Sequence, residues 1–346
     1  MSRKYNIAVV GASGAVGEEL FHVLTELNFP VASVLPLASA NSVGKEIECL
    51  GETYKIEELT ESVFEGRDID IAFFSAGGNI SEQYAKYAVE AGAVVIDNTS
   101  HFRMDPNVPL VVPEVNPEDI AAWRDTGIIA NPNCSTIQMV LALKPLHDMY
   151  GIQRVDVSTY QAVSGAGKAG AEELMRQMQD FFAFKLDESE HKAFMHQIAL
   201  NVIPQIDVPM ENDYTKEEMK MVNETNKIMH SSFAVSATCV RVPVFRSHSE
   251  SITVTFDDSV DVDIERVRLA LHEFENVEVM DDLANGIYPM PTISTDSDIT
   301  FVGRIRKDTY ADNIMHMWVS ADQLRVGAAT NSIRIALKWI ELEESI

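Results

Sequence analysis

Residues 4–17, KYNIAVVGASGAVG, decide the fold of the chain. The apolar run 4–10 predicts a buried parallel strand, and the ten residues that follow the glycines, EELFHVLTEL, predict a helix. Gly11, Gly14 and Gly17 are spaced three apart between them. Glycine lets a backbone approach a pyrophosphate closely, and a helix N-terminus favours negative charge. The stretch predicts a dinucleotide-binding loop; the alternative is a tight turn in an α/β protein that binds no nucleotide.

The alternation of strand and helix continues to about residue 130 and predicts a doubly wound parallel sheet of Rossmann type. Residues 81–92 form the second expected helix. Short apolar runs that predict strands occur at 31–39, 68–78, 93–100, 108–115 and 127–130.

A different pattern follows and predicts a second domain over residues 131–325. Its strands are longer and more alternating, as in RVDVSTYQAV and ESITVTFDD, and three helices are expected near 168–184, 215–229 and 263–274. This is typical of an α+β domain with a mixed sheet. The final helix, about 326–346, is expected to pack back on the first domain, residues 1–130.

Composition narrows the possible functions. The 346 residues carry a net charge of −26, which disfavours nucleic acid as a partner. The chain contains no apolar run long enough to span a membrane and no signal-peptide pattern, so we expect a cytoplasmic protein. Its three cysteines are widely spaced and indicate neither disulfides nor a zinc cluster, so no metal is expected.

The end of the second strand bears on cofactor choice. A carboxylate there is typical of NAD-binding proteins, where it binds the ribose 2′-hydroxyl. Residues 38–42, ASANS, contain hydroxyl and amide groups but no carboxylate. This favours NADP, although a preference for NAD stays open.

Cys134 is the candidate nucleophile. It follows the turn Asn131–Pro132–Asn133 and opens an expected helix. A helix N-terminus stabilises a thiolate, and its free N–H groups, together with the Asn133 amide, are suited to hold an oxyanion. The alternative is a small residue packed behind the turn.

Several long motifs carry a family resemblance: GASGAVG, DNTSHFRM, NPNCSTIQM, STYQAVSGAGKAG, EEMKMVNETNKIM and SATCVRVPVFRSHSES. They span essentially the whole chain, which resembles the aspartate-β-semialdehyde dehydrogenase family. The resemblance implies reversible NADPH-dependent reduction of L-aspartyl-4-phosphate to L-aspartate 4-semialdehyde, in the biosynthesis of lysine, methionine and threonine. It also implies a catalytic domain that forms dimers, and hence a homodimer.

The resemblance also implies roles for individual residues. Cys134 would be the nucleophile that forms a thioester, His248 the base, and Gln161 the amide that orients the acyl group. Arg241 would bind the substrate carboxylate, with Arg103 and Lys220 on the phosphate and Glu217 either on the substrate ammonium or on Lys220. The expected cofactor-binding residues are Gly11, Ser13, Gly14, Ala15, Val16, Asn41, Ser42, Ser164, Gly165 and Gln323.

Other interpretations remain open from the residues alone. Without the resemblance, His248 is better interpreted as a surface histidine in a loop. Arg241 has the alternative of a structural ion pair with a buried acid, and Glu217 with Lys220 that of a solvated helix face. Many bacterial relatives have an arginine where this chain has Asn41, which bears on the strength of NADP preference. Related enzymes on the same scaffold are N-acetyl-γ-glutamyl-phosphate reductase, glyceraldehyde-3-phosphate dehydrogenase and malonyl-CoA reductase. A nucleotide-binding paralogue without catalysis is the remaining alternative.

Overall fold

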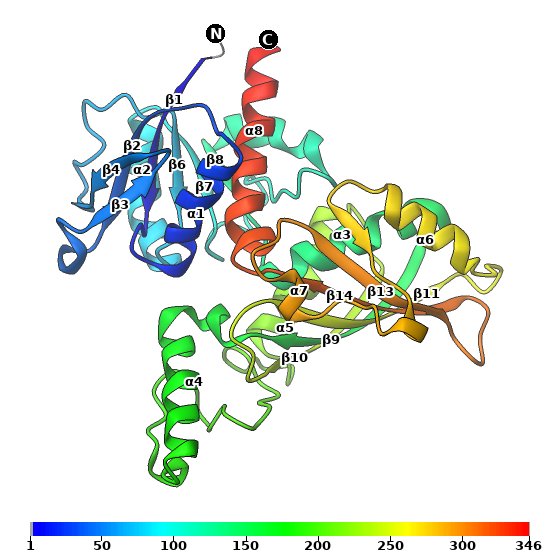
Figure 1. The fold of residues 1–346 in the computed structure, drawn as a ribbon. Coiled ribbons are helices and arrows are strands. Elements are labelled where there is room, and N and C mark those ends of the chain that lie inside the picture. Colours follow the sequence, from blue (N-terminus) through cyan, green and yellow to red (C-terminus); the bar gives the residue numbers. More distant parts are fainter. Residues whose placement is uncertain (1–2, 346) are drawn as a thin grey trace. The chain divides into compact units, whose positions relative to one another are not determined.

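The computed structural model describes residues 3–345, which divide into two compact units. The first comprises residues 3–133 and 328–345, and the second residues 134–327. Figure 1 shows the elements of each unit in chain order.

The first unit is built on a six-stranded parallel sheet with the order β5-β2-β1-β6-β7-β8. A small antiparallel hairpin, β3–β4, accompanies it. The strands are β1 (Tyr5–Val10), β2 (Val31–Ala38), β3 (Glu46–Cys49), β4 (Glu52–Lys55), β5 (Glu57–Glu58), β6 (Ile71–Phe74), β7 (Val94–Asp97) and β8 (Ile128–Ala130). The helices are α1 (Ala15–Glu26), η1 (Ala40–Ser42), α2 (Gly78–Glu90), η2 (Pro117–Asp125) and α8 (Thr330–Glu344).

Helix α8 belongs to the core of this unit although it lies at the other end of the sequence. Ala336, Trp339 and Ile340 lie three, six and seven positions after Ile333, on one face of the helix, and all four are buried. The Trp339 ring meets that of Trp123 edge-on, with centroids 5.6 Å apart. The final helix therefore packs in the core of the unit that contains the parallel sheet.

The predicted strand at 108–115 is wrong. The structure has only an isolated bridge there, between Leu110 and Ala130. Pro109 and Pro113 flank this point, and proline has no N–H to donate to a ladder, so pairing does not extend along the segment. The apolar side chains are nevertheless buried, which is why the run resembles a strand.

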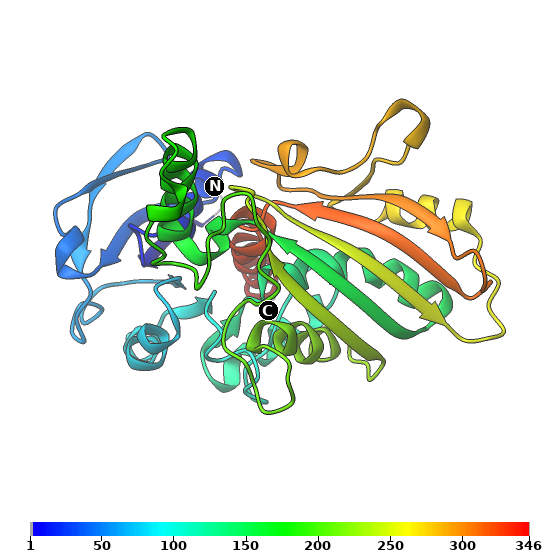
Figure 2. The ribbon, with the colours of Figure 1, turned by 90° about the horizontal axis from the view of Figure 1, so that it is seen from below.

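The second unit contains a mixed six-stranded sheet with the order β10-β9-β11-β14-β13-β12. The outer pairs β10–β9 and β12–β13 are parallel and the central pairs antiparallel. The strands are β9 (Ile152–Gln161), β10 (Ala234–Arg241), β11 (His248–Phe256), β12 (Val277–Val279), β13 (Thr300–Lys307) and β14 (Ile314–Ala321). Figure 2 looks onto the face of this sheet opposite α3 and α6.

The helices of the second unit include three close to those expected. They are α3 (Cys134–Tyr150), η3 (Val163–Ala166), α4 (Gly167–Phe182), η4 (Leu186–Glu188), α5 (Lys216–Ile228), α6 (Ile264–Glu273), η5 (Leu283–Asn285), α7 (Pro291–Ser294) and the π-helical turn η6 (Arg325–Ala329). Among the described residues, no helix is long and apolar enough to cross a bilayer.

Candidate active site

The glycine loop has the shape that its sequence predicts. Gly11 has a φ of +93°, and Gly14 is the residue before α1. A Cβ on Gly17 would lie 2.2 Å from the Gly11 carbonyl oxygen, so only glycine lets the helix approach the loop this closely. Backbone N–H groups at this helix start form a cradle that suits a pyrophosphate.

The end of β2 faces the same loop. Ser42 is buried, and its hydroxyl donates to the Ser13 Oγ at 3.1 Å. Two residues expected to bind the cofactor are therefore in contact, whereas Asn41 is exposed beside them. Hydroxyl and amide groups of this kind suit a 2′-phosphate, because no carboxylate in residues 38–42 would repel it.

Arg103 is buried in the first unit. Its Nε donates to the Asn131 carbonyl at 2.9 Å and its Nη2 to the Asn98 carbonyl at 2.8 Å. The first bond joins the Arg103 guanidinium to Asn131, two residues before Asn133, which is also buried.

In the second unit, Cys134 is the first residue of α3 and is partly exposed. A Cβ on Gly327 would lie 2.6 Å from the Cys134 Cβ, so the start of the helix rests directly on the backbone of η6. The helix N-terminus therefore holds the thiol in a defined position and favours its thiolate.

Three other candidate residues lie at one end of the mixed sheet. Arg241 ends β10 and pairs with Gln161, which ends β9. His248 begins β11, on the other side of β9. All three side chains are buried, and their positions follow from the register of the strands.

The Ala162 peptide holds two of these side chains. Its N–H donates to the His248 Nδ1 at 3.0 Å, and its carbonyl accepts from the Arg241 Nη1 at 2.7 Å. Because Nδ1 accepts, a neutral His248 carries its hydrogen on Nε2. Burial and the nearby Arg241 charge lower the pKa of His248 to about 3, so the ring is neutral at pH 7.

Gly165 provides the space beside these groups. A Cβ there would lie 2.8 Å from the Arg241 Nη1 and 3.2 Å from the His248 Nε2. Ser164 accepts a hydrogen bond from the Gln323 Nε2, and the Gln323 Oε1 accepts from the Ser247 N–H at 2.6 Å. The structure thus brings together Ser164, Gly165 and Gln323, three of the residues expected to bind the cofactor.

Arg241 faces a cavity of about 200 Å³ lined also by Phe194, His196, Gln205 and Asp207. Within residues 3–345 its guanidinium makes no ion pair; the Phe194 ring lies 5.9 Å away. Burial lowers the pKa of Arg241, an effect that Glu217 and Cys134 oppose. A guanidinium in this setting suits a bound carboxylate better than a structural ion pair.

Gln161 is fixed by two neighbours. Its Oε1 accepts from the Thr159 Oγ1 at 2.9 Å, and its Nε2 donates to the Glu217 Oε1 at 3.1 Å. These two bonds fix the amide orientation, so the side chain is held in place before any substrate arrives.

Glu217 holds Lys220, one of the two roles expected for it. The Lys220 Nζ lies 2.9 Å from the Glu217 Oε2 and 2.9 Å from the Asp207 Oδ2. Burial alone would lower the pKa of Lys220, but the two carboxylates together raise it. A capping box of Thr215 and Glu218 starts the helix that carries both residues.

Sequence reasoning missed Asp207, Phe194, Thr159 and Gly327. Asp207 and Phe194 lie in a loop without a periodic pattern, and only folding brings them to Arg241. Gly327 carries a readable signal, since a glycine inside an apolar helical pattern marks a close backbone contact.

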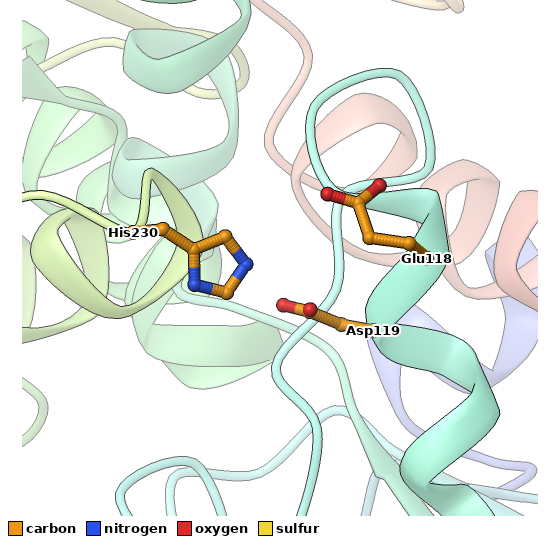
Figure 3. A group of neighbouring side chains, drawn as sticks. All are labelled: Glu118, Asp119 and His230. Atoms are coloured by element: carbon orange, nitrogen blue, oxygen red, sulfur yellow. The ribbon is translucent and has the colours of Figure 1, made fainter.

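Figure 3 shows Glu118, Asp119 and His230, side chains with metal-ligand chemistry. Glu118 and Asp119 open η2 in the first unit, whereas His230 follows α5 in the second. The Asn116 Nδ2 donates to the Asp119 Oδ2 at 2.6 Å, so this carboxylate serves the start of η2. Because the group is divided between the two units, it supports no metal assignment.

Comparison with known proteins defines the class of the chain. Residues 6–123 match the family "Semialdehyde dehydrogenase, NAD binding domain", and residues 143–326 match "Semialdehyde dehydrogenase, dimerisation domain". The chain is therefore an oxidoreductase of the semialdehyde dehydrogenase class.

Full-length relatives identify the family within this class. The chain is 64% identical over 343 residues to the aspartate-semialdehyde dehydrogenase of Campylobacter jejuni, with 99% of each chain covered. A crystal structure of aspartate semialdehyde dehydrogenase II from Vibrio cholerae, complexed with ASA, has a TM-score of 0.93 and 46% identity, covering 98% of this chain and 99% of that one. The Candida albicans enzyme with NADP has a TM-score of 0.75 and 26% identity, covering 99% and 100%. The chain belongs to the aspartate-semialdehyde dehydrogenase family.

Proposed function

We propose that the protein catalyses the reversible conversion of L-aspartyl-4-phosphate and NADPH to L-aspartate 4-semialdehyde, phosphate and NADP⁺. The observation that carries this proposal is Arg241, a buried guanidinium without an ion pair in residues 3–345 that faces a small cavity. A short amino-acid substrate supplies the missing carboxylate. The names of close relatives support the same substrate.

In the direction of reduction, the Cys134 thiolate attacks the acyl carbon and phosphate leaves with the electrons of the C–O bond. This gives a thioester on Cys134. Gln161 orients the acyl group, and Arg241 holds the α-carboxylate. Arg103 and Lys220 bind the phosphate, with Lys220 kept in place by Glu217 and Asp207.

A nicotinamide held by Ser164, Gly165 and Gln323 would supply the hydride for reduction of the thioester carbonyl. His248 donates a hydrogen bond from Nε2–H to the oxyanion that this reduction forms. The oxyanion then re-forms the C=O bond as the C–S bond breaks, which releases the aldehyde and the Cys134 thiolate. This role follows from the Ala162 N–H, which occupies Nδ1 and leaves the neutral ring as a hydrogen-bond donor at Nε2. It refines the role of base that the sequence suggests.

For the cofactor we propose NADP, bound by the loop Gly11, Ser13, Gly14, Ala15 and Val16. The hydroxyl groups of Ser13 and Ser42 are suited to bind the 2′-phosphate, and the exposed Asn41 lies next to Ser42 in the chain. Ser164, Gly165 and Gln323 are proposed to serve the nicotinamide end.

Absorbance of reduced nicotinamide tests the reaction, with L-aspartate 4-semialdehyde, phosphate and either NADP⁺ or NAD⁺. We expect phosphate-dependent reduction of NADP⁺ that is abolished in Cys134→Ala, with a lower kcat/KM for NAD⁺. Turnover with malonate semialdehyde plus CoA or with N-acetylglutamate semialdehyde, and none with aspartate semialdehyde, would overturn the substrate assignment. Undiminished turnover in Cys134→Ala would overturn the nucleophile.

We further propose a homodimer formed through the sheet face shown in Figure 2. The Tyr160 and Trp318 rings lie together on β9 and β14, with centroids 5.2 Å apart, and Tyr160 is 38% exposed. An aromatic pair on a partly exposed sheet face suits the core of a subunit interface. The match to a dimerisation domain supports this assignment.

A further inference from the structure

Three neighbouring strands carry a second row of side chains, two positions along each strand from the candidate catalytic residues. Thr159 pairs with Cys239 on one side and with Glu250 on the other. Each lies two residues from Gln161, Arg241 or His248 and, because side chains alternate along a strand, on the same face. Thr159 already shows what this row does, because its hydroxyl fixes the Gln161 amide.

Glu250 is the unexplained member of the row. Its side chain is fully buried, and neither carboxyl oxygen has a hydrogen-bond partner within residues 3–345. Gln138, on α3, is also buried, and both of its amide atoms lack partners among the same residues. Leaving such groups buried and unpaired is costly, so their retention requires a reason.

The two side chains act on each other. Burial raises the pKa of Glu250 well above its usual value, and the Gln138 amide is the group that opposes this rise. Gln138 lies one helical turn after Cys134, and Glu250 lies two residues after His248. Gln138 therefore shares α3 with Cys134, and Glu250 shares β11 with His248.

A carboxylic acid and a primary amide are complementary. The acid O–H donates to the amide oxygen, and the amide N–H donates to the acid carbonyl, which gives two hydrogen bonds from one pair. An ionised carboxylate has no hydrogen to donate and would leave the amide oxygen unpaired.

We propose that Gln138 and Glu250 form this hydrogen-bonded pair and thereby hold the Cys134 end of α3 in register with the His248 end of β11. Both are positioning residues, since neither reaches the cavity beside Arg241. The proposal rests on the catalytic roles of Cys134 and His248 stated above.

Substitutions in the full-length enzyme test the pair. Glu250→Gln keeps two complementary hydrogen bonds, now between two amides, and should hold kcat within about twofold, whereas Glu250→Met should lower kcat about tenfold with little change in KM. The reversed pair, Gln138→Glu with Glu250→Gln, should regain most of the kcat that Gln138→Met loses. Ile252→Met, at the next buried position of β11, is the matched control and should leave kcat unchanged.

A second readout does not depend on the substrate. Cys49 and Cys239 are buried, so alkylation of the folded protein by iodoacetamide reports on Cys134. We expect slower alkylation in Glu250→Met than in Glu250→Gln at an equal melting temperature. This result would stand even if aspartate semialdehyde proved not to be the substrate.

Three results would overturn the proposal: an unchanged kcat in Glu250→Met, equal losses in Glu250→Met and Glu250→Gln, or a reversed pair no better than Gln138→Met. If Glu250→Met does not fold, Gln138→Met provides the same comparison.

Discussion

At the scale of single residues, the chemistry of the candidate site depends on which ring nitrogen of His248 carries the hydrogen. The Ala162 N–H binds the His248 Nδ1, and burial with the Arg241 charge lowers the pKa of the ring to about 3. An unfolded histidine titrates near 6.5, so the two states differ in protonation between these values.

This difference predicts the pH dependence. Between about pH 6.5 and pH 3 the unfolded state binds the additional proton, so His248 makes stability fall as the pH falls through that window. In His248→Asn this contribution should disappear, which denaturant unfolding at a series of pH values will show. For activity, kcat/KM of the wild type should lack an inflection near 6.5; a clear one that vanishes in His248→Asn would contradict a neutral ring.

Gly165 makes a second prediction at this scale. A methyl group there would lie 2.8 Å from the Arg241 Nη1, so the guanidinium would have to move. In Gly165→Ala we expect KM for aspartate semialdehyde to rise about tenfold, with a smaller change in kcat, because binding of the carboxylate is lost first. An unchanged KM would contradict the role of Arg241 in binding the substrate carboxylate.

At the scale of elements, helix α3 connects the nucleophile to the core. Its first residue rests on η6, where a Cβ on Gly327 would lie 2.6 Å from the Cys134 Cβ. Neither group is the end of a flexible chain, so the first turn of α3 would have to move.

We therefore expect Gly327→Ala to lower kcat at least about a hundredfold, since a displacement of about 1 Å at a reacting group has effects of this size. Gly78→Ala is the control, because its added Cβ would meet its nearest neighbour at 3.8 Å. Kinetics and melting temperature are measured together. A folded Gly327→Ala protein with full activity would show that the contact is not needed.

At the scale of the whole molecule, the proposed homodimer depends on the mixed sheet of the second unit. One face carries α3 and α6, and Figure 2 shows the opposite face. Tyr160 and Trp318 alternate with buried neighbours along β9 and β14, and their rings lie together on this opposite face. If that face is the dimer interface, a charge placed at its centre must be desolvated without a partner.

Sedimentation of Trp318→Asp tests this interface. We expect a monomer at micromolar concentrations where the wild type is a dimer, and loss of activity with it. Tyr310→Asp is the matched control, because Tyr310 is 98% exposed in the turn between β13 and β14. A wild-type monomer at these concentrations would reject the homodimer.

The sequence by itself determined the features that short stretches encode. Glycine spacing predicts the turn between β1 and α1, and the helices expected near 215–229 and 326–346 correspond to α5 and α8. The helix that begins at Cys134 is also readable, because capping and periodicity act within a few residues. The resemblance to a family then supplied the site residues, which local pattern alone left ambiguous.

Only the tertiary structure decided which side chains meet. Strand register brings Arg241, Gln161 and His248 to one end of a sheet, although β10 and β9 are far apart in sequence. Asp207 pairs with Lys220, the Ala162 N–H sets the His248 tautomer, and Glu250 pairs with Thr159 next to the candidate site. The segment 108–115 is buried and apolar but forms only an isolated bridge, because its prolines have no N–H groups to pair with a neighbouring strand. Register, burial and charge are properties of the packed chain, and no single stretch of residues contains them.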